Sequence, residues 1–290
     1  MRIRYNCLPC LVNQAVKVAE LTDAPNRDEL FRQVFAYLSE IDFTRTNPEV
    51  IGATFRMLKR HIGNDDPYRE TRQRYNRLFV EHSARFESAI AAAENPFEQA
   101  IKYAILGNII DFNPMHPIGM GEIMAYFADA DRLPLTINDA PRLRSDIIVA
   151  QKLLYLGDNC GEICLDKLLI RQLRALNPNL QIHFGVRGAP VVNDSIEEDA
   201  YAVGMDECAS IISNGDDSLG TVLSRVRPEF RAVYDAADVV IAKGQANYEC
   251  LSEQTHKNIY FLLMTKCEVI AKDVGVPQRS LICMGGLRHD

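Results

Sequence analysis

An Asp-Asn pair, Asp158 and Asn159, is the first feature of the sequence that could do chemistry. It follows the apolar run 153–156, and a helix is predicted to begin just after it. A carboxylate and an amide oxygen are hard ligands of the kind that Mg²⁺ and Mn²⁺ prefer. Glu162 and Asp166 would share one face of that helix, where either could act as a base or orient a metal-bound water. The alternative is that the pair only caps the helix.

A second pair, Asn193 and Asp194, follows the apolar run 182–186 in the same way. Asp194 could complete a set of oxygen ligands with the first pair. It could also cap the helix that is predicted from residue 195 to residue 201. Because two carboxylate–amide pairs follow consecutive strands, we favour a metal site over two unrelated helix caps.

Two further polar segments follow apolar runs. Ser213, Asn214 and Gly215 begin a loop rich in glycine and hydroxyl groups that could hold a phosphate, although Asn-Gly-Asp is also ordinary turn chemistry. Lys243 comes directly after the run 239–242, where its ammonium could neutralise a phosphoryl oxygen. The alternative for Lys243 is a side chain that extends to solvent at the rim of the sheet.

The second half of the chain predicts the sheet that would gather these residues. Short apolar runs alternate there with amphipathic segments, which is typical of buried parallel strands joined by helices in an open α/β sheet. The runs lie at residues 153–156, 182–186, 211–212, 239–242, 259–263 and 281–284. Ligands bind beyond the carboxyl ends of such strands, where the polar segments stand.

The first half of the chain predicts helices, and we place the boundary between the two regions near residue 145. Expected features are a capping box of Asn26 with Glu29, a helix start at Pro48, one long helix over 68–93 and a helix start at Pro96.

The composition argues against several classes of protein. The net charge is −7, with Lys and Arg scattered, whereas a surface that binds duplex DNA normally carries a basic stripe. No apolar stretch approaches the roughly 20 residues of a membrane helix, and no secretory signal is recognisable. Eight cysteines suit reduced thiols better than a disulfide framework. We therefore expect a cytoplasmic protein that binds neither nucleic acid nor membrane, and the oligomeric state stays open.

Cys7 and Cys10 have the spacing of half a zinc site, and a structural site needs four ligands. Cys267 and Cys283 could join them from the far end of the chain. A redox pair is a second interpretation. We favour a third, in which two buried thiols anchor the N-terminal helix. The glycine-rich signatures of dinucleotide and nucleoside triphosphate sites are absent.

In their order along the chain, these motifs resemble the damage-control phosphatase family, formerly catalogued as domain of unknown function 89. The resemblance is strongest to the prokaryotic subgroup with an N-terminal Cys-x-x-Cys, and it spans nearly the whole chain. It rests on Cys7-Leu8-Pro9-Cys10 with Gln14, Gly107-Asn108-Ile109-Ile110-Asp111, Gly157-Asp158-Asn159-Cys160-Gly161-Glu162, Pro190-Val191-Val192-Asn193-Asp194, Ser213-Asn214-Gly215 with Gly220-Thr221, and Lys243-Gly244-Gln245-Ala246-Asn247-Tyr248-Glu249.

The resemblance implies a helical region, residues 1–145, packed on a Rossmann-like three-layer α/β/α domain, residues 146–290. It implies a divalent metal, Mg²⁺, Mn²⁺, Co²⁺ or Ni²⁺, held by Asp158, Asn159 and Asp194. The implied activity is hydrolysis of small phosphate monoesters, such as sugar phosphates or damaged phosphometabolites, with Lys243 near the phosphate. The other matched polar residues are expected to contact the substrate: Asn108, Asp111, Glu162, Ser213, Asn214, Gly215, Asn247 and Glu249. Arg187 departs from the family, in which a lysine often stands there.

Three alternatives stay open. An aspartate could attack phosphorus covalently, as in haloacid-dehalogenase-type phosphatases; these carry Asp-x-Asp, however, so we favour attack by a metal-bound water. The domain could instead bind S-adenosylmethionine and methylate protein carboxylates, although the glycine-rich loop is missing. The chain could also be a non-catalytic metal-binding protein that uses Cys7 and Cys10.

Overall fold

The computed structural model describes residues 1–109, 120–128 and 130–285, and seven strands in these ranges form one sheet. The strands are β1 (Leu135–Asn138), β2 (Lys152–Leu156), β3 (Gln181–Val186), β4 (Ser210–Ser213), β5 (Val239–Lys243), β6 (Ile259–Met264) and β7 (Leu281–Gly285). All six predicted apolar runs lie in these strands, so the α/β fold class is confirmed. β1 is a further strand that the apolar pattern did not indicate.

The strand order is β1-β7-β6-β5-β2-β3-β4. Neighbouring strands are parallel except β6 and β7, which are antiparallel. The expectation of parallel strands was therefore wrong for β7. The chain winds outward from β2 to β3 and β4 on one side, and from β5 to β6 on the other. The direction of winding thus reverses between β2 and β5, the place where open α/β sheets bind ligands beyond the strand ends.

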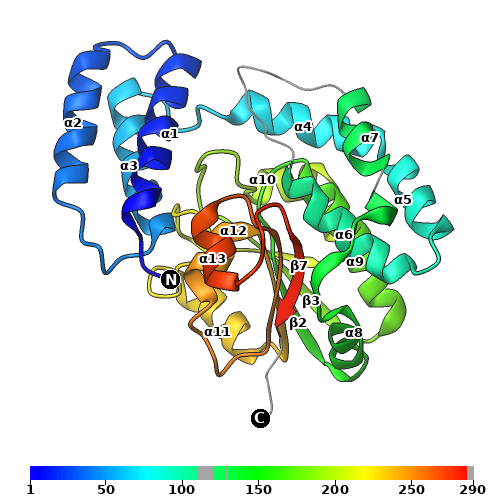
Figure 1. The fold of residues 1–290 in the computed structure, drawn as a ribbon. Helices are drawn as coiled ribbons and strands as arrows, with labels where there is room; N and C mark the ends of the chain where they lie inside the picture. The colour runs from blue at the N-terminus through cyan, green and yellow to red at the C-terminus, as the bar shows by residue number, and fades with distance from the viewer. Residues whose placement is uncertain (110–119, 129, 286–290) are drawn as a thin grey trace.

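Helices surround the sheet (Figure 1). Those that precede it are α1 (Leu8–Leu21), α2 (Arg27–Ser39), α3 (Asn47–Ile62), α4 (Arg69–Glu81), α5 (Ser83–Ala92), α6 (Pro96–Leu106) and α7 (Met120–Ala128). The helices that lie between successive strands along the chain are α8 (Ala140–Val149), α9 (Glu162–Leu176), α10 (Glu197–Ala202), α11 (Pro228–Ala236), α12 (Gly244–Leu251) and α13 (Glu268–Val274). Short 3₁₀ turns are η1 (Tyr5–Cys7), η2 (Gly107–Ile109), η3 (Ala130–Arg132) and η4 (Met205–Glu207). No helix in the described ranges has the length and apolar character needed to span a membrane.

Both faces of the sheet are covered because successive side chains of a strand point to opposite faces. Tyr155 of β2 packs in one core together with residues of α4, α5, α6, α8 and α9. Leu154 and Leu156 pack in the other, with residues of α11, α12 and α13. A third core lies among α1, α2 and α3, which Figure 1 shows as a group beside the sheet. β1 precedes residue 145 in the chain and α8 spans it, yet β1 pairs with β7 as the edge strand of the sheet.

The helical half differs from expectation in two places. Asn26 has a left-handed backbone, φ 45°, and makes no side-chain capping bond, so the predicted capping box with Glu29 is wrong. The long helix expected over 68–93 is two helices, α4 and α5, which meet at His82. The helix starts at Pro48 and Pro96 are confirmed. Thr46 caps the first of these helices through a capping box with Glu49.

Candidate functional site

Asp158 lies just beyond the carboxyl end of β2 and is 6 % exposed. Its Oδ2 accepts hydrogen bonds from Asn108 Nδ2 at 2.5 Å and from Asn159 Nδ2 at 3.0 Å. Asn108 comes from η2, at the end of α6, so the helical half contributes directly to the site. Gly244 is required beside it, because its φ is +75° and a Cβ atom there would overlap the Asp158 carboxylate.

Asp194 lies in the loop after β3, and the backbone holds this loop against the one that follows β2. Cys160 N donates to Asn193 O at 2.9 Å, and Ser195 N donates to Asp158 O at 2.8 Å. Asn159 and Asp194 form an isolated β-bridge. The two Asp-Asn pairs, distant in sequence, therefore meet at one edge of the sheet, which is where strand-end residues were expected to gather.

Arg187 is a buried cation between the two aspartates. Its Nε donates to Asp194 Oδ2 at 2.7 Å, and one terminal nitrogen lies 3.6 Å from Asp158 Oδ1. The side chain is 1 % exposed. Arg187 thus orients Asp194 and offsets part of the negative charge that the two carboxylates bring together.

Glu162 and Lys243 form a second layer behind Asp158, and both are completely buried. Glu162 Oε2 accepts from Asn108 Nδ2 at 2.8 Å and from Asn159 Nδ2 at 2.9 Å. Lys243 Nζ donates to Glu162 Oε1 at 2.6 Å and to Asp166 Oδ1 at 2.5 Å. Because its ammonium is held by these two carboxylates, Lys243 orients Glu162, which in turn orients the two amides.

Burial and mutual repulsion raise the pKa values of acidic side chains in this site. Burial raises the pKa of Asp158 to about 8, and the charges of Asp194 and Glu162 add to the rise, while Arg187 and Lys266 oppose it. The pKa of Asp194 is also raised by burial, against the effect of Arg187. Asp158 therefore keeps its proton at neutral pH unless a further positive charge enters.

Deeper in the protein, burial raises the pKa of Asp166 to about 6, against the opposing charge of Lys243. The pKa of Lys243 is raised although burial alone would lower it, since Asp166 and Glu162 stabilise its charge. The site thus contains two buried cations, Arg187 and Lys243, and four buried carboxylates. The carboxylates are those of Asp158, Glu162, Asp166 and Asp194. A divalent cation would balance the remaining two charges if all four acids were ionised.

The donor set fits a hard divalent cation. Asp158 and Asp194 offer carboxylate oxygens, and Asn159 offers an amide oxygen. Within the described ranges, no group of three or more Asp, Glu, His or Cys side chains is arranged so that it could hold a metal ion by itself. The candidate set therefore depends on the amide oxygen of Asn159.

A cavity of about 420 Å³ opens at this edge of the sheet. Its volume is in the range that binds small molecules. The lining residues are Asn6, Cys7, Cys10, Gln14, Asn47, Ile51, Asn108, Asp158, Asn159, Val192, Asn193, Asp194, Leu219, Gln245, Ala246, Glu249, Lys266, Cys267 and Val269. Of the predicted site residues, Asn108, Asp158, Asn159, Asp194 and Glu249 line this cavity.

The other predicted residues that the structure describes do not line it. Glu162 and Lys243 stand behind it, as does Asn247, whose Nδ2 donates to Lys243 O at 2.7 Å. Asp111 lies outside the residues that the structure describes. Contacts of these residues with a substrate stay a prediction.

Ser213, Asn214 and Gly215 support the Arg187 loop instead of lining the cavity. Asn214 N donates to Val186 O at 2.8 Å, and Gly215 N donates to Ser213 Oγ at 3.2 Å. Gly188, next to Arg187, packs so tightly on Gly215 that a Cβ atom would overlap its backbone. The role of this loop as a phosphate cradle stays a prediction.

The cysteine motif lies at the cavity. Cys7, Cys10 and Cys267 all line it, whereas Cys283 is buried in β7. Cys7 is buried but Cys10 is exposed, so the interpretation of two buried anchoring thiols is wrong for Cys10. All eight cysteines lie in described residues and are free thiols. Burial raises the pKa of both Cys7 and Cys10, which disfavours the reactive thiolate.

Sequence reasoning missed Lys266, an exposed lysine on the cavity wall. The signal was available, because Lys266 stands just past the end of β6, where the strand-end rule applies as it does after β2 and β3. Arg187 was noticed only as a departure from the family pattern. Arg187 and Asp194 stand at the two ends of the loop after β3, and their spacing in the sequence does not show that the side chains form an ion pair.

Glu249→Gln is expected to stabilise the protein at alkaline pH. Burial raises the pKa of Glu249 from 4.5 to about 7, against a hydrogen bond from Asn47 and the charge of the amino terminus. An acid whose folded pKa is raised loses stability as pH rises from its unfolded pKa to its folded pKa. We expect the variant to exceed wild type at pH 8, by on the order of 2–3 kcal/mol, and to match it near pH 4.5.

Urea denaturation of both proteins at the two pH values tests this expectation. Asp235→Asn, at an exposed residue paired with Arg231, is a control for removing one acid. Equal stability of wild type and Glu249→Gln at pH 8 would show that the buried carboxyl carries no penalty.

Comparison with known proteins identifies the family. The chain matches the damage-control phosphatase ARMT1-like domain over residues 3–282. It is 32% identical to a damage-control phosphatase of Pyrococcus horikoshii, covering 98% of each chain. It is 30% identical to a damage-control phosphatase of Archaeoglobus fulgidus, covering 95% of this chain and 96% of the other.

The fold agrees with these matches. The crystal structure of a DUF89 family protein from Pyrococcus horikoshii superposes with a TM-score of 0.86 at 30% identity, covering 99% of both chains. The resemblance expected from the motifs is therefore confirmed over the whole chain. The chain belongs to the damage-control phosphatase ARMT1-like domain family.

Proposed function

We propose that this protein is a phosphatase that depends on a divalent metal and hydrolyses small phosphate monoesters, such as sugar phosphates or damaged phosphometabolites. The observation that carries the proposal is the cluster of Asp158, Asn159 and Asp194, whose carboxylates are only partly balanced by Arg187, on the wall of a cavity of about 420 Å³. The names of the Pyrococcus and Archaeoglobus relatives support the reaction class. The strand order around β2 and β5 supports a Rossmann-like arrangement.

Asp158, Asn159 and Asp194 would hold Mg²⁺, Mn²⁺, Co²⁺ or Ni²⁺. Such an ion, when bound, neutralises phosphoryl oxygens and lowers the pKa of water. The chain's own residues prepare the site for it. Asn108 and Asn159 fix the Asp158 carboxylate through their amides, and Arg187 fixes Asp194. Because these hydrogen bonds hold the two carboxylates in place, the proposed site is preorganised for a cation.

We favour attack of water on phosphorus over attack by Asp158. Oδ2 of Asp158 already accepts two amide hydrogen bonds, and Oδ1 faces Arg187 at 3.6 Å. A carboxylate engaged in this way has little freedom to approach phosphorus as a nucleophile. Trapping of a phosphorylated aspartate during turnover would contradict this preference.

Removal of the metal is expected to abolish activity reversibly. Phosphate release is measured from a panel of phosphate monoesters with chelator alone and then with Mg²⁺, Mn²⁺, Co²⁺ or Ni²⁺ restored. We expect activity only with a restored metal, and none in Asp158→Ala, while Asp235→Ala at an exposed position keeps wild-type activity. Full activity in chelator or in Asp158→Ala would contradict the proposal. Tight binding of S-adenosylmethionine without metal would favour the methyltransferase alternative.

A further inference from the structure

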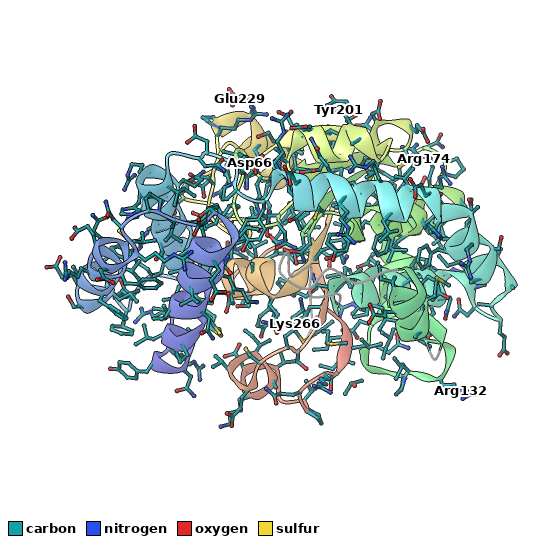
Figure 2. The ribbon with its side chains drawn as sticks, turned by 90° about the horizontal axis from the view of Figure 1, so that it is seen from above. Asp66, Arg132, Arg174, Tyr201, Glu229 and Lys266 are labelled. Carbon is teal, nitrogen blue, oxygen red and sulfur yellow. The ribbon has the colours of Figure 1, made fainter. Side chains whose placement is uncertain are left out.

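A buried polar network lies between α4 and α10, and none of its side chains lines the cavity of about 420 Å³. Arg72 and Asn76 stand four positions apart on α4, so they share one face of that helix. Both are buried, at 1 % and 2 % exposure, as is Asp199 of α10. Figure 2 shows the cyan α4 running beside α10, which carries the labelled Tyr201, with Asp66 near the start of α4. Polar groups buried in this way are costly unless each has a partner.

Each side chain of the network has such a partner. Arg72 Nε donates to Asp199 Oδ2 at 2.8 Å, and Arg72 Nη2 donates to Asp66 Oδ2 at 2.8 Å. Asn76 Nδ2 donates to Asp199 Oδ1 at 2.8 Å. A carboxylate only accepts hydrogen bonds, so the amide nitrogen of Asn76 has to face Asp199. The amide oxygen of Asn76 is therefore directed away from Asp199.

This amide oxygen reaches the loop that carries the candidate ligands Asp158 and Asn159. Asn76 Oδ1 accepts a hydrogen bond from Gly161 N at 2.7 Å. Gly161 directly precedes α9 and has a φ of +69°. Backbone N–H groups at the start of a helix have no partner within it, and Asn76 supplies one from α4. The bond thus fixes the far end of the short segment 158–161.

The same network reaches the loop after β3. Asp199 Oδ2 also accepts from Ile196 N at 3.0 Å, two residues beyond Asp194. Between them, Ser195 N donates to Asp158 O at 2.8 Å and ties this loop to the one after β2. A single amide–carboxylate pair therefore holds both loops that carry the candidate metal ligands, and the amide of that pair comes from the helical half of the chain.

We propose that Asn76, held by Asp199 and Arg72, is a positioning residue that sets the metal affinity of the candidate site by fixing the loop of Asp158 and Asn159. This inference rests on the proposed function and deepens it. Loss of a group that orients a metal site typically lowers metal affinity by about 10- to 100-fold. If Asn76 only satisfied a buried amide, its loss would lower stability and leave the metal affinity unchanged.

The sharpest variant exchanges the two members of the pair. Asn76→Asp alone keeps an acceptor for Gly161 N but sets a second carboxylate against Asp199. In the double variant Asn76→Asp with Asp199→Asn, the amide nitrogen at position 199 can donate to the carboxylate at position 76. The amide oxygen at position 199 can still accept from Arg72 Nε and Ile196 N. The double variant thus preserves both the net charge and the pattern of hydrogen bonds.

The test compares wild type, Asn76→Ala and the double variant with Phe79→Leu as a matched control. Phe79 is a buried residue of the same helix that stacks on Phe86 and has no polar side-chain atom. Mn²⁺ affinity is measured by isothermal titration. Hydrogen exchange of the backbone amides of residues 157–162 is measured in the metal-free protein, and urea denaturation gives the stability of each variant.

We expect Asn76→Ala to weaken Mn²⁺ binding by about 10- to 100-fold and to speed exchange of the Gly161 amide by about tenfold. The double variant should recover most of both losses, because its hydrogen bonds to the two loops are restored. Phe79→Leu should lower stability through lost packing, yet bind Mn²⁺ within twofold of wild type.

Mn²⁺ affinity of Asn76→Ala within twofold of wild type, or a loss equalled by Phe79→Leu, would overturn the inference. A double variant with the stability of wild type and the Mn²⁺ affinity of Asn76→Ala would overturn it too. Should Asn76→Ala not fold, the metal-free wild type still decides, since a Gly161 amide that exchanges as fast as an unstructured one rules out the bond. The proposed function fails by a different result, in which the wild type binds Mn²⁺ but releases phosphate from no monoester.

Discussion

Asp158→Asn is expected to abolish phosphatase activity, by about a thousandfold or more, while leaving the metal-free protein at least as stable as wild type. The substitution removes the negative charge with which Asp158 would bind a metal. By rough analogy with the removal of an oxyanion-hole donor, loss of such a preorganised group lowers kcat by at least two to three orders of magnitude. An asparagine oxygen can still accept the hydrogen bonds that Asn108 and Asn159 donate. The local structure is therefore preserved.

The expectation for stability follows from the pKa of Asp158, which burial raises to about 8. An acid with a raised folded pKa destabilises the protein increasingly as pH rises from about 4 to about 8. Asparagine carries no such penalty. The metal-free variant should thus equal wild type near pH 4 and be more stable than wild type at pH 8.

Three measurements test this prediction together: kcat/KM with Mn²⁺, Mn²⁺ affinity by titration, and the melting temperature in chelator at both pH values. Asp235→Asn, which removes an exposed acid, should leave all three unchanged. Retention of a tenth of the activity, or unchanged Mn²⁺ affinity, would contradict the assignment of Asp158 as a ligand. A variant that melts well below wild type would show that activity was lost through misfolding.

Much of the fold could be predicted because buried strands leave a strong pattern of apolar runs. β1 was missed because its sequence, Leu-Thr-Ile-Asn, alternates apolar and polar residues over only four positions at the sheet edge. The direction of β7 was missed for another reason. An apolar run has the same pattern in a parallel and an antiparallel strand, so only the path of the chain after α13 decides the direction.

The candidate site was predicted as far as the strand-end rule reaches. It brought Asp158, Asn159 and Asp194 together, and applied after β6 it would also have found Lys266. It could not reveal which polar groups face the cavity. Lys243 ends β5 in a promising position, but the rotation of α9 against the sheet turns Glu162 and Asp166 toward its ammonium. Packing between elements of this kind leaves no trace in residue spacing.

Lys243→Met is expected to be among the most destabilising single substitutions in this protein, lowering the free energy of unfolding by about 3–5 kcal/mol at pH 8. Lys243, Glu162 and Asp166 are all buried, and removal of the ammonium leaves two carboxylates close together without a counter-charge. Among the described residues, Tyr155 is the side chain that still donates a hydrogen bond to Asp166, from its hydroxyl to Oδ1 at 2.7 Å. One hydroxyl does not replace a full charge.

The deficit should depend on pH in a defined direction. The pKa of Asp166 is already raised to about 6, and loss of Lys243 raises it further. Protonation of Asp166 then relieves the repulsion, so the deficit shrinks as pH falls from 8 to 5.5. Denaturant titrations at the two pH values measure this, with Lys272→Met, at an exposed pair with Glu268, as a control expected within about 0.5 kcal/mol of wild type.

The double variant Lys243→Met with Asp166→Asn separates a supporting role of Lys243 from a direct contact with phosphate. Removing one charge of each sign should recover part of the lost stability. If Lys243 only orients Glu162, phosphate affinity should recover with stability. If Lys243 contacts the phosphate, affinity should stay low in a protein that folds well. A single variant Lys243→Met that loses less than about 1 kcal/mol at pH 8 would contradict the assignment of a stabilising role to this buried ammonium.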